Sequence, residues 1–328
     1  MTEPTLSVVL CTYNGEAYLR AQLDSLLDQA RLPDEIIAGD DCSVDSTWAV
    51  LEAFAIQAKL AGVRVRLIRQ ERNRGFVINF TETLKQASGD VLFLCDQDDR
   101  WHHDKIATMA HRFEEDPNLL LLFSDARRVD GDGRELPHSL FDALELAEEE
   151  RRAVRQGEAF EVLLRRSMVT GATAAFRRQL LDTALPVGDG WIHDEWLAVV
   201  AAATGRVGMI ERALIDYRQH ANNQIGMRKR SLSDKWIDLV RPRRQQFIEE
   251  VRRMASLQLL LAKADADRFA VPLARIERKR IHFERRIALG ALPHWARLPG
   301  VLQEAARGNY RRFGTGRRSM LRDLLRRE

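Results

Sequence analysis

An alternation of strand-like and helix-like segments over the first 125 residues constrains the fold of this chain most. Short runs rich in Val, Ile and Leu alternate with longer segments whose apolar residues recur every three or four positions. Strands joined through helices pair in parallel and carry helices on both faces of the sheet. The sequence therefore predicts an α/β protein with a mostly parallel, Rossmann-like sheet. The predicted strands are 6–11, 35–40, 63–68, 90–95 and 119–124, and the predicted helices are 16–29, 46–60, 76–86 and 104–115.

The pattern continues after residue 125 and then becomes helical. Residues 131–157 are polar and acidic, which predicts a mobile or helical excursion. The following predicted elements are a buried strand at 170–176, a helix at 193–203, and one strand or two short ones at 207–217. From residue 231 onward the apolar residues follow a helical period, as Phe247, Val251, Met254, Leu257 and Leu261 do. We therefore expect an α/β domain over residues 1–225 and a helical domain over residues 226–328.

The charge distribution supports this division. The net charge is only +3, but residues 228–328 hold 26 Lys and Arg against 11 Asp and Glu, a formal charge of +15. Residues 1–227 hold 25 basic and 37 acidic residues, a formal charge of −12. An acidic region followed by a basic one predicts two modules with different partners.

Several classes of protein are disfavoured by simple features of the sequence. No run of 18 apolar residues is present, so we expect no transmembrane helix. The first residues, MTEPTLSVVLCTYN, lack the basic region of a signal peptide. The three cysteines have no CxxC spacing, which argues against a disulfide framework or a zinc site. These features predict a cytoplasmic protein with free thiols.

Polar residues follow four of the predicted strands, at the edge where ligands bind in open parallel sheets. Asp99, which comes after the fourth of these strands, either lies at this edge or only caps the next helix. A solvated turn is one explanation of so many carboxylates, and a bound cation is the other, because a divalent metal converts their repulsion into binding. The four groups are Cys11-Thr12-Tyr13-Asn14-Gly15, Asp40-Asp41-Cys42-Ser43, Asn73-Arg74-Gly75 and Asp96-Gln97-Asp98-Asp99.

A nucleotide is the natural ligand of such an edge, yet the usual phosphate-binding motifs are missing. Neither GxGxxG nor GxxxxGK[ST] occurs in the chain. An acidic edge repels a diphosphate unless a cation lies between them. Mg²⁺ or Mn²⁺ held by Asp98, with Asp96 nearby, removes this conflict because such ions take carboxylate oxygens and keep positions open for phosphate oxygens.

Three of these stretches resemble the successive motifs of the family 2 inverting glycosyltransferases, which have the GT-A fold. They are TLSVVLCTYNGEAYL, EIIAGDDCSVDST and GDVLFLCDQDDRW, and the resemblance covers residues 5–220. It implies that a nucleoside-diphosphate sugar is the donor. The DQDD-x-W form is similar to that of bacterial rhamnosyltransferases, which favours dTDP-rhamnose. The implied base, ribose and sugar contacts are Thr12, Tyr13, Asn14, Asp41 and Asp96, and the implied metal ligand is Asp98.

The loop after the third predicted strand is a weaker candidate for the same site. Asn73 and Gly75 either contact the donor or form a plain turn, in which Gly75 supplies a positive φ. We include both residues in the predicted donor site.

Two later motifs carry the chemistry that the resemblance implies. The segment GWIHDEW places Asp194 at the start of a helix, where the family has its catalytic base, and Glu195 and His193 are the alternatives. The segment YRQH is similar to an element that meets the metal or the diphosphate. It implies that Arg218 contacts the donor and that His220 binds the metal.

The predicted function is an inverting transfer of a sugar, with rhamnose favoured, to a cell-surface polysaccharide or a lipid-linked acceptor. The alternatives are a sugar-phosphate nucleotidyltransferase and a non-catalytic, membrane-associated assembly factor with the same fold. The basic C-terminal region either forms a helical bundle with solvated arginines or rests on an anionic membrane. Binding of nucleic acid is not expected, because no nucleic-acid motif accompanies the charge.

Overall fold

The computed structural model describes residues 3–220 and 241–327, which fall into two compact units. The first unit comprises Met1–Ala159, Met168–Val187 and Ile192–Met227, and the second comprises Phe160–Ser167, Gly188–Trp191 and Arg228–Glu328. Two short segments from the first 225 residues thus belong to the second unit. The expected boundary between residues 225 and 226 lies outside the described residues.

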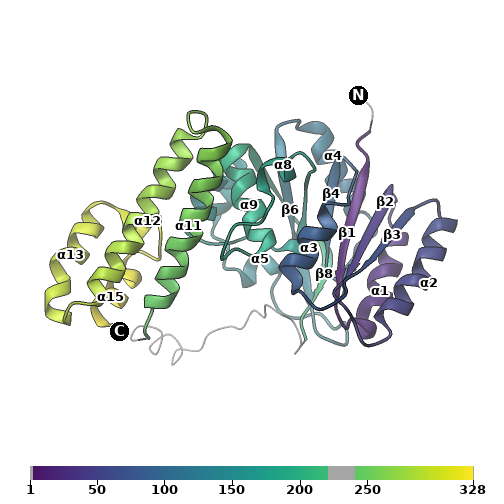
Figure 1. Cartoon of the computed structure of the whole chain (residues 1–328), viewed down its shortest axis with the longest axis horizontal. Helices are drawn as coiled ribbons and strands as arrows, with labels where there is room; N and C mark the ends of the chain where they lie inside the picture. The colour runs from purple at the N-terminus through teal and green to yellow at the C-terminus, as the bar shows by residue number, and fades with distance from the viewer. Residues whose placement is uncertain (1–2, 221–240, 328) are drawn as a thin grey trace. The chain divides into compact units, whose positions relative to one another are not determined.

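The first unit is built on one mixed sheet (Figure 1). Among the described residues, eight strands form it in the order β3-β2-β1-β4-β7-β6-β8-β5. The strands β3, β2, β1 and β4 run parallel, whereas β7 pairs antiparallel with β4 and with β6. The strand bounds are β1 Leu6–Thr12, β2 Glu35–Asp40, β3 Arg64–Arg69, β4 Val91–Cys95, β5 Arg100–Trp101, β6 Leu119–Val129, β7 Ala174–Arg177 and β8 Arg206–Arg218.

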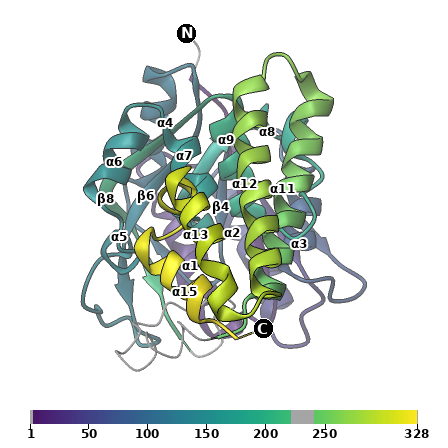
Figure 2. The ribbon, with the colours of Figure 1, turned by 90° about the vertical axis from the view of Figure 1, so that its left-hand side faces the viewer.

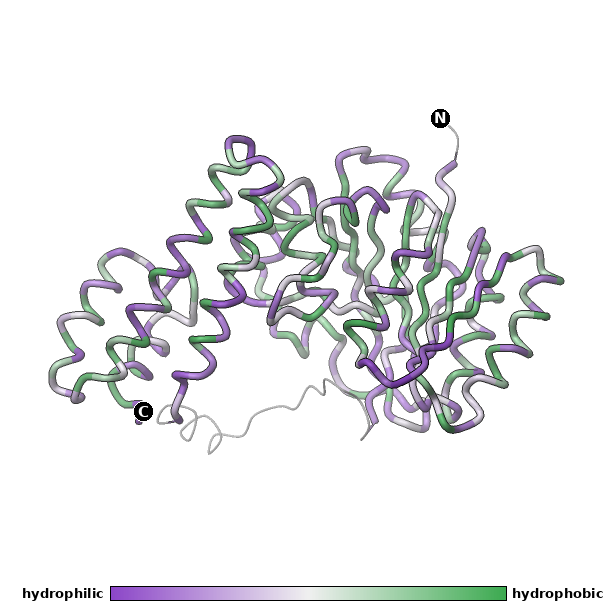
Figure 3. The backbone as a smooth tube through the Cα atoms, in the orientation of Figure 1, coloured by the Kyte–Doolittle hydropathy of each residue, from purple (hydrophilic) through white to green (hydrophobic). Residues whose placement is uncertain are grey.

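Helices cover both faces of this sheet, as the alternation predicted. Side chains of α1 (Glu16–Leu27), α2 (Thr47–Leu60) and α4 (Lys105–Glu115) join a buried core with one face of β1, β2 and β4. On the opposite face, α3 (Phe76–Leu84) contacts β1 and β2, and α9 (His193–Thr204) contacts β6 and β8 (Figure 1). Figure 3 shows the apolar residues gathered along the inner strands. The α/β architecture is confirmed.

The structure also refines the later predictions. The predicted excursion at residues 131–157 contains two short helices, and residues 207–217 lie in the single strand β8 rather than in two strands. The strand at residues 119–124 continues to Val129, because β6 pairs along its length with β8. The remaining elements are α5 Leu140–Ala143, α6 Glu148–Arg155, α7 Ala159–Arg165, the 3₁₀ turn η1 Gly171–Thr173 and α8 Leu180–Ala184.

The second unit is helical (Figure 2). Two long helices pack against each other, and Phe247, Phe283 and Phe313 form an aromatic cluster. Phe247, Met254, Leu257 and Leu261 are buried, which confirms the predicted helical face. No helix among the described residues is long and apolar enough to cross a membrane. Besides most of α7, the described helices of this unit are α11 Arg244–Asp265, α12 Ala270–Gly290, α13 His294–Ala306, α14 Asn309–Arg312 and α15 Arg317–Leu325.

Candidate active site

The turns that follow β1 and β2 are joined by hydrogen bonds between their side chains and backbone. Thr12 Oγ1 donates to Asp40 Oδ1 at 3.0 Å, and the backbone N–H of Asn14 donates to Ser43 Oγ at 2.9 Å. Asn14 has φ of 46°, in the left-handed region that Asn tolerates better than most residues. Thr12 and Asn14 therefore shape the turn, and the Tyr13 side chain between them is 40% exposed and open to a ligand.

Asp41 connects the second and third strand ends. Its carboxylate is 2% exposed and accepts the backbone N–H groups of Arg74 and Gly75, each at 2.8 Å. Gly75 has φ of +85°, which an L side chain rarely adopts, so glycine is required there for backbone reasons. Asn73, the other predicted donor contact in this loop, is exposed. Asp41 thus positions the loop, and any contact with a nucleotide would add to these hydrogen bonds.

The acidic turn after β4 contains the predicted metal ligands. Asp98 Oδ2 lies 2.8 Å from His220 Nε2, across 122 residues of sequence. The His220 ring also stacks on Tyr18, with ring centroids 4.8 Å apart. Both predicted metal ligands are therefore brought together, although 122 residues separate them.

The neighbouring carboxylates have different environments. Burial raises the pKa of Asp96 to about 7, and the charges of Asp98 and Asp194 add to the shift. Asp99 is 1% exposed and accepts the backbone N–H of Arg218 at 2.9 Å. The alternative that Asp99 caps the next helix is wrong, because α4 begins six residues later, at Lys105, and its N-cap is Asp104.

Arg218 supports the acidic turn from the end of β8. Its guanidinium donates to the carbonyl oxygens of Asp98 at 2.8 Å and Gly131 at 2.9 Å, and it lies 4.8 Å from the centre of the Tyr18 ring. These contacts hold the backbone that carries the predicted metal ligand. The sequence predicted a donor contact for Arg218, and the contacts described here are with the protein itself.

The predicted base lies at the start of α9. Asp194 Oδ2 accepts the backbone N–H of Gly171 at 2.9 Å, and Oδ1 accepts that of Glu195 at 2.7 Å. A carboxylate has about four acceptor positions, so two backbone N–H groups leave room for an acceptor hydroxyl. Asp194 is also close enough to Asp96 to raise its pKa. The base candidate and the acidic turn thus belong to one electrostatic site.

The alternative base His193 is a packing residue in this structure. Its ring is 5% exposed and stacks on Phe80, with centroids 4.0 Å apart and planes 16° apart. Burial lowers its pKa, and its Nδ1 has no hydrogen-bond partner among the described residues. These surroundings favour a neutral, structural imidazole.

Two polar residues of this region were missed at the sequence level. Gln97 accepts the backbone N–H of Tyr13 at 2.8 Å and donates to the Tyr13 carbonyl at 3.1 Å, which joins the first and fourth strand ends. Lys105 is fully buried, donates to the Ala172 carbonyl at 2.6 Å, and has a pKa lowered by burial to about 7. The position of Gln97 within the acidic motif was the available signal. Nothing in the sequence indicated the burial of Lys105, which lies in the first turn of an amphipathic helix.

The chemistry of Asp98 and His220 fits a divalent cation. Adjacent ligands of an octahedral ion bound at about 2.1 Å lie about 3 Å apart, close to the separation of these two atoms. Among the described residues, no group of three or more His, Cys, Asp or Glu side chains is arranged to hold a metal. The pair therefore fits an ion that takes its other ligands from water and substrate oxygens.

Comparisons with known proteins give the family. The model for glycosyl transferase family 2 matches residues 7–185, more than half of the chain. The chain belongs to this family. The described fold is of the GT-A class, as its structural neighbours are.

Relatives in bacteria extend the similarity. An uncharacterized protein of Mycobacterium tuberculosis is 28% identical over 219 residues, or 66% of this chain and 59% of its own length. The chain thus matches about three fifths of the length of that relative. The Shigella flexneri dTDP-rhamnosyl transferase RfbG is 25% identical over 252 residues, which cover 75% of this chain and 83% of RfbG.

Solved structures show the same fold at low sequence identity. Residues 1–349 of S. aureus TarS in complex with UDP-GlcNAc give a TM-score of 0.55 at 18% identity, covering 97% of this chain and 90% of that one. The mannosyltransferase PcManGT from Pyrobaculum calidifontis, in complex with GDP-Man and Mn²⁺, gives 0.51 at 19% identity, covering 93% and 76%. At these identities the likeness establishes the fold alone.

Proposed function

We propose that this chain is an inverting glycosyltransferase that uses a nucleoside-diphosphate sugar, with dTDP-rhamnose as the favoured donor. The observation that carries the proposal is the convergence of Asp98, His220 and Asp194 on one strand-end site. The similarity to the dTDP-rhamnosyl transferase RfbG supports the choice of donor. The acceptor would be a cell-surface polysaccharide or a lipid-linked saccharide.

The residues divide the chemistry in a simple way. Asp194 takes the proton of the acceptor hydroxyl while that oxygen attacks the anomeric carbon. Asp98 and His220 would hold a Mn²⁺ or Mg²⁺ ion, which when bound stabilises the negative charge of the departing nucleoside diphosphate. Arg218 holds the backbone of the acidic turn, so that the Asp98 carboxylate keeps its direction.

The donor side of the site uses residues from three strand ends. Tyr13 offers an exposed ring for stacking on a base. Asp41 accepts the backbone N–H groups of Arg74 and Gly75, in the loop that also carries Asn73, and Thr12 and Asn14 fix the turn beside it. We propose that these residues, with Asp96, surround the nucleotide and its sugar.

The two alternative functions, nucleotidyl transfer and a non-catalytic role, predict different products from the sugar transfer proposed here. A nucleotidyltransferase would release inorganic diphosphate from a nucleoside triphosphate, and a non-catalytic factor would turn over neither substrate. The test is to incubate the purified chain with a panel of nucleotide sugars, with and without Mn²⁺, and to follow thermal unfolding and release of nucleoside diphosphate. Donor-specific protection that needs Mn²⁺, together with release of nucleoside diphosphate on adding acceptor, is the expected result.

We also propose a peripheral contact of the second unit with an anionic membrane. Trp295 is 84% exposed, and Leu298 and Leu302 on the same helix, α13, are 48% and 53% exposed. Their spacing of three and four residues places them on one stripe, and an exposed Trp is typical of a surface that inserts into the headgroup region. The formal charge of +15 over residues 228–328 would add attraction to anionic lipids.

A further inference from the structure

A cavity of about 350 Å³ lies in the second unit, apart from any residue of the predicted active site. Most of the residues that line it belong to α12, where they recur every three or four positions and so share one face of that helix. Arg307 and Asn309 come from the junction between α13 and α14. The volume lies in the range of small-molecule sites. The described residues that line it are Ala274, Glu277, Arg278, Ile281, Arg285, Arg307 and Asn309.

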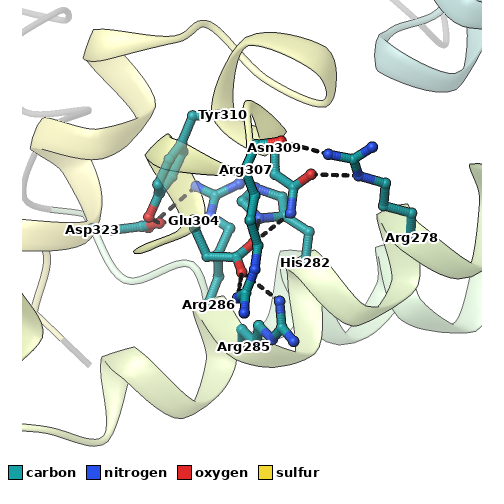
Figure 4. Close-up of polar contacts among 9 residues, drawn as sticks. All are labelled: Arg278, His282, Arg285, Arg286, Glu304, Arg307, Asn309, Tyr310 and Asp323. Carbon is teal, nitrogen blue, oxygen red and sulfur yellow. Dashed lines mark hydrogen bonds and ion pairs between the residues drawn. The ribbon is translucent and has the colours of Figure 1, made fainter. Parts of the chain in front are cut away.

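A buried carboxylate holds two of these arginines in place. Glu304 is 1% exposed and accepts Nη1 of Arg285 at 2.6 Å, Nη1 of Arg307 at 2.9 Å and Nδ2 of Asn309 at 2.7 Å (Figure 4). The Nδ1 atom of the buried His282 lies 2.7 Å from the same carboxylate. The guanidinium groups are therefore positioned before any ligand arrives.

The third arginine is held by neutral groups. Arg278 Nε donates to Asn309 Oδ1 at 2.8 Å, and Arg278 Nη2 donates to the Arg307 carbonyl (Figure 4). The one acidic residue among the lining residues given above, Glu277, forms an ion pair with Arg280 at 2.7 Å. The positive charge of Arg278 is thus not matched by a carboxylate among its hydrogen-bond partners.

The positive charge exceeds what the buried carboxylate requires. One guanidinium would neutralise Glu304, yet Arg285 and Arg307 both contact it and Arg278 lies beside them. The side chains of Arg285 and Arg307 are 43% and 39% exposed, so water or a ligand reaches them. Within the described residues, the Nε and Nη2 groups of these two arginines have no hydrogen-bond partner. Unused donors around a concave opening indicate a ligand with several acceptor oxygens.

We propose that this cavity binds a phosphate-ester anion. A guanidinium group matches two phosphate oxygens with a pair of parallel hydrogen bonds, and such charge-assisted bonds are stronger than neutral ones. Three positioned guanidinium groups suit a group that carries two negative charges. This site goes beyond the proposed transfer reaction, because it requires neither the donor nor the metal.

The experiment is calorimetric titration of the full chain with inorganic pyrophosphate in the presence of EDTA and without nucleotide sugar. Saturable binding is expected, and Arg278→Gln and Arg285→Gln should each weaken it at least tenfold. Arg280→Gln is the matched control, since it removes the same charge from the same helix at a residue that pairs with Glu277 and Glu284, and it should change binding less than twofold.

Thermal unfolding of each variant shows whether the fold persists, and Arg278→Lys provides a second variant that keeps the charge but loses the fork geometry. Arg278→Lys should weaken binding several-fold. Absence of saturable binding by the intact chain, or an equal loss in Arg280→Gln, would overturn the proposal. Because no donor is present, this result is independent of the outcome for sugar transfer.

A second arm identifies the source of the phosphate. Vesicles with phosphatidic acid and vesicles of equal surface charge with phosphatidylserine are compared in co-sedimentation. A preference for phosphatidic acid that Arg278→Gln removes assigns the site to a lipid headgroup. Pyrophosphate binding without that preference assigns it to a soluble anion that carries phosphate groups. A chain that binds neither probe at this cavity has no such site.

Discussion

Two buried carboxylates, one in each unit, have pKa values shifted in opposite directions. In the first unit, burial and the charges of Asp98 and Asp194 raise the pKa of Asp96 to about 7. In the second unit, hydrogen bonds from Asn309, His282 and two arginines outweigh burial and lower the pKa of Glu304 to about 2.

The raised pKa of Asp96 indicates a site that favours a bound cation, whereas the lowered pKa of Glu304 indicates a carboxylate that is already paired within the protein. Crowded carboxylates near one another favour binding of a cation, and at Asp96 burial and the neighbouring carboxylates outweigh the opposing charge of Lys105. Glu304 and Asp323 are each paired with arginines of their own unit. We therefore expect substitutions in the first unit to affect function most, and those in the second to affect stability or binding.

The largest expected effect is at the predicted base. Asp194→Asn should leave donor binding intact and reduce transfer by roughly 10²–10⁴-fold, the usual range for loss of a general base. The measurement is the turnover rate together with donor affinity by calorimetry. Glu195→Gln is the matched control and should be milder. If that order were reversed, the base would be Glu195, and unchanged turnover in both variants would exclude the mechanism.

A smaller effect is expected at the metal pair. Asp98→Asn should remove the Mn²⁺-dependent part of donor binding, a loss on the order of tenfold or more, because one of two protein ligands becomes a weaker neutral one. Calorimetric titration of dTDP-rhamnose with and without Mn²⁺ measures it. Asp104→Asn, at the half-exposed start of α4 where Asp104 pairs with Arg212, is the control. Equal affinity of Asp98→Asn and the intact chain in Mn²⁺ would contradict the assignment.

Substitution of Glu304 is expected to reduce the stability of the fold and to leave the active site unaffected. Glu304→Gln should destabilise the folded chain by about 1–3 kcal/mol, the range for lost hydrogen bonds to charged groups, and leave donor affinity unchanged. The measurement is thermal or urea unfolding at pH 7. Glu284→Gln, which loses an exposed pair with Arg280, is the control and should change stability by less than 1 kcal/mol.

The lowered pKa of Glu304 also predicts how the stability of the fold changes at acidic pH. The folded pKa of Glu304 is about 2, below its ordinary value of 4.5, so its contribution to stability is present above about pH 4.5 and is lost as the pH falls towards 2. Glu304→Gln should therefore unfold with a weaker pH dependence over this window. A pH profile parallel to that of the intact chain would show that Glu304 is not the group responsible.

The smallest expected effect concerns the exposed stripe on α13. Trp295→Ser should reduce binding to anionic vesicles several-fold without changing donor affinity, because an exposed Trp contributes apolar area at the lipid surface. Co-sedimentation at low and high salt measures it, with Leu259→Ser, an exposed apolar residue on α11, as the control. Equal recovery of the intact chain with neutral and anionic vesicles would exclude an electrostatic membrane role.

Local periodicity allowed much of the first unit to be predicted. The predicted segment 35–40 is the strand β2 without change, and the other early strands differ by only one residue at an end, apart from the longer β6. These elements follow from side-chain alternation and helical spacing, which neighbouring residues determine. The strand-end position of Asp41 and Asp98 followed too, because parallel strands end at one edge.

Other features depend on contacts between distant residues, and the sequence did not indicate them. The antiparallel insertion of β7 between β4 and β6, the burial of Lys105, and the arginines around Glu304 all join segments far apart in the chain.

The sequence by itself thus determined the α/β class, the alternation of strands and helices over the first 125 residues, and the motifs at the ends of the strands. The family resemblance implied that Asp98 and His220 meet at a metal, but only the tertiary structure decided that Asp99 binds the backbone of Arg218 and that Glu304 binds two arginines. The physical reason is that periodicity reports which face of an element is buried. The partner of a polar side chain is set by packing between elements, which no local pattern encodes.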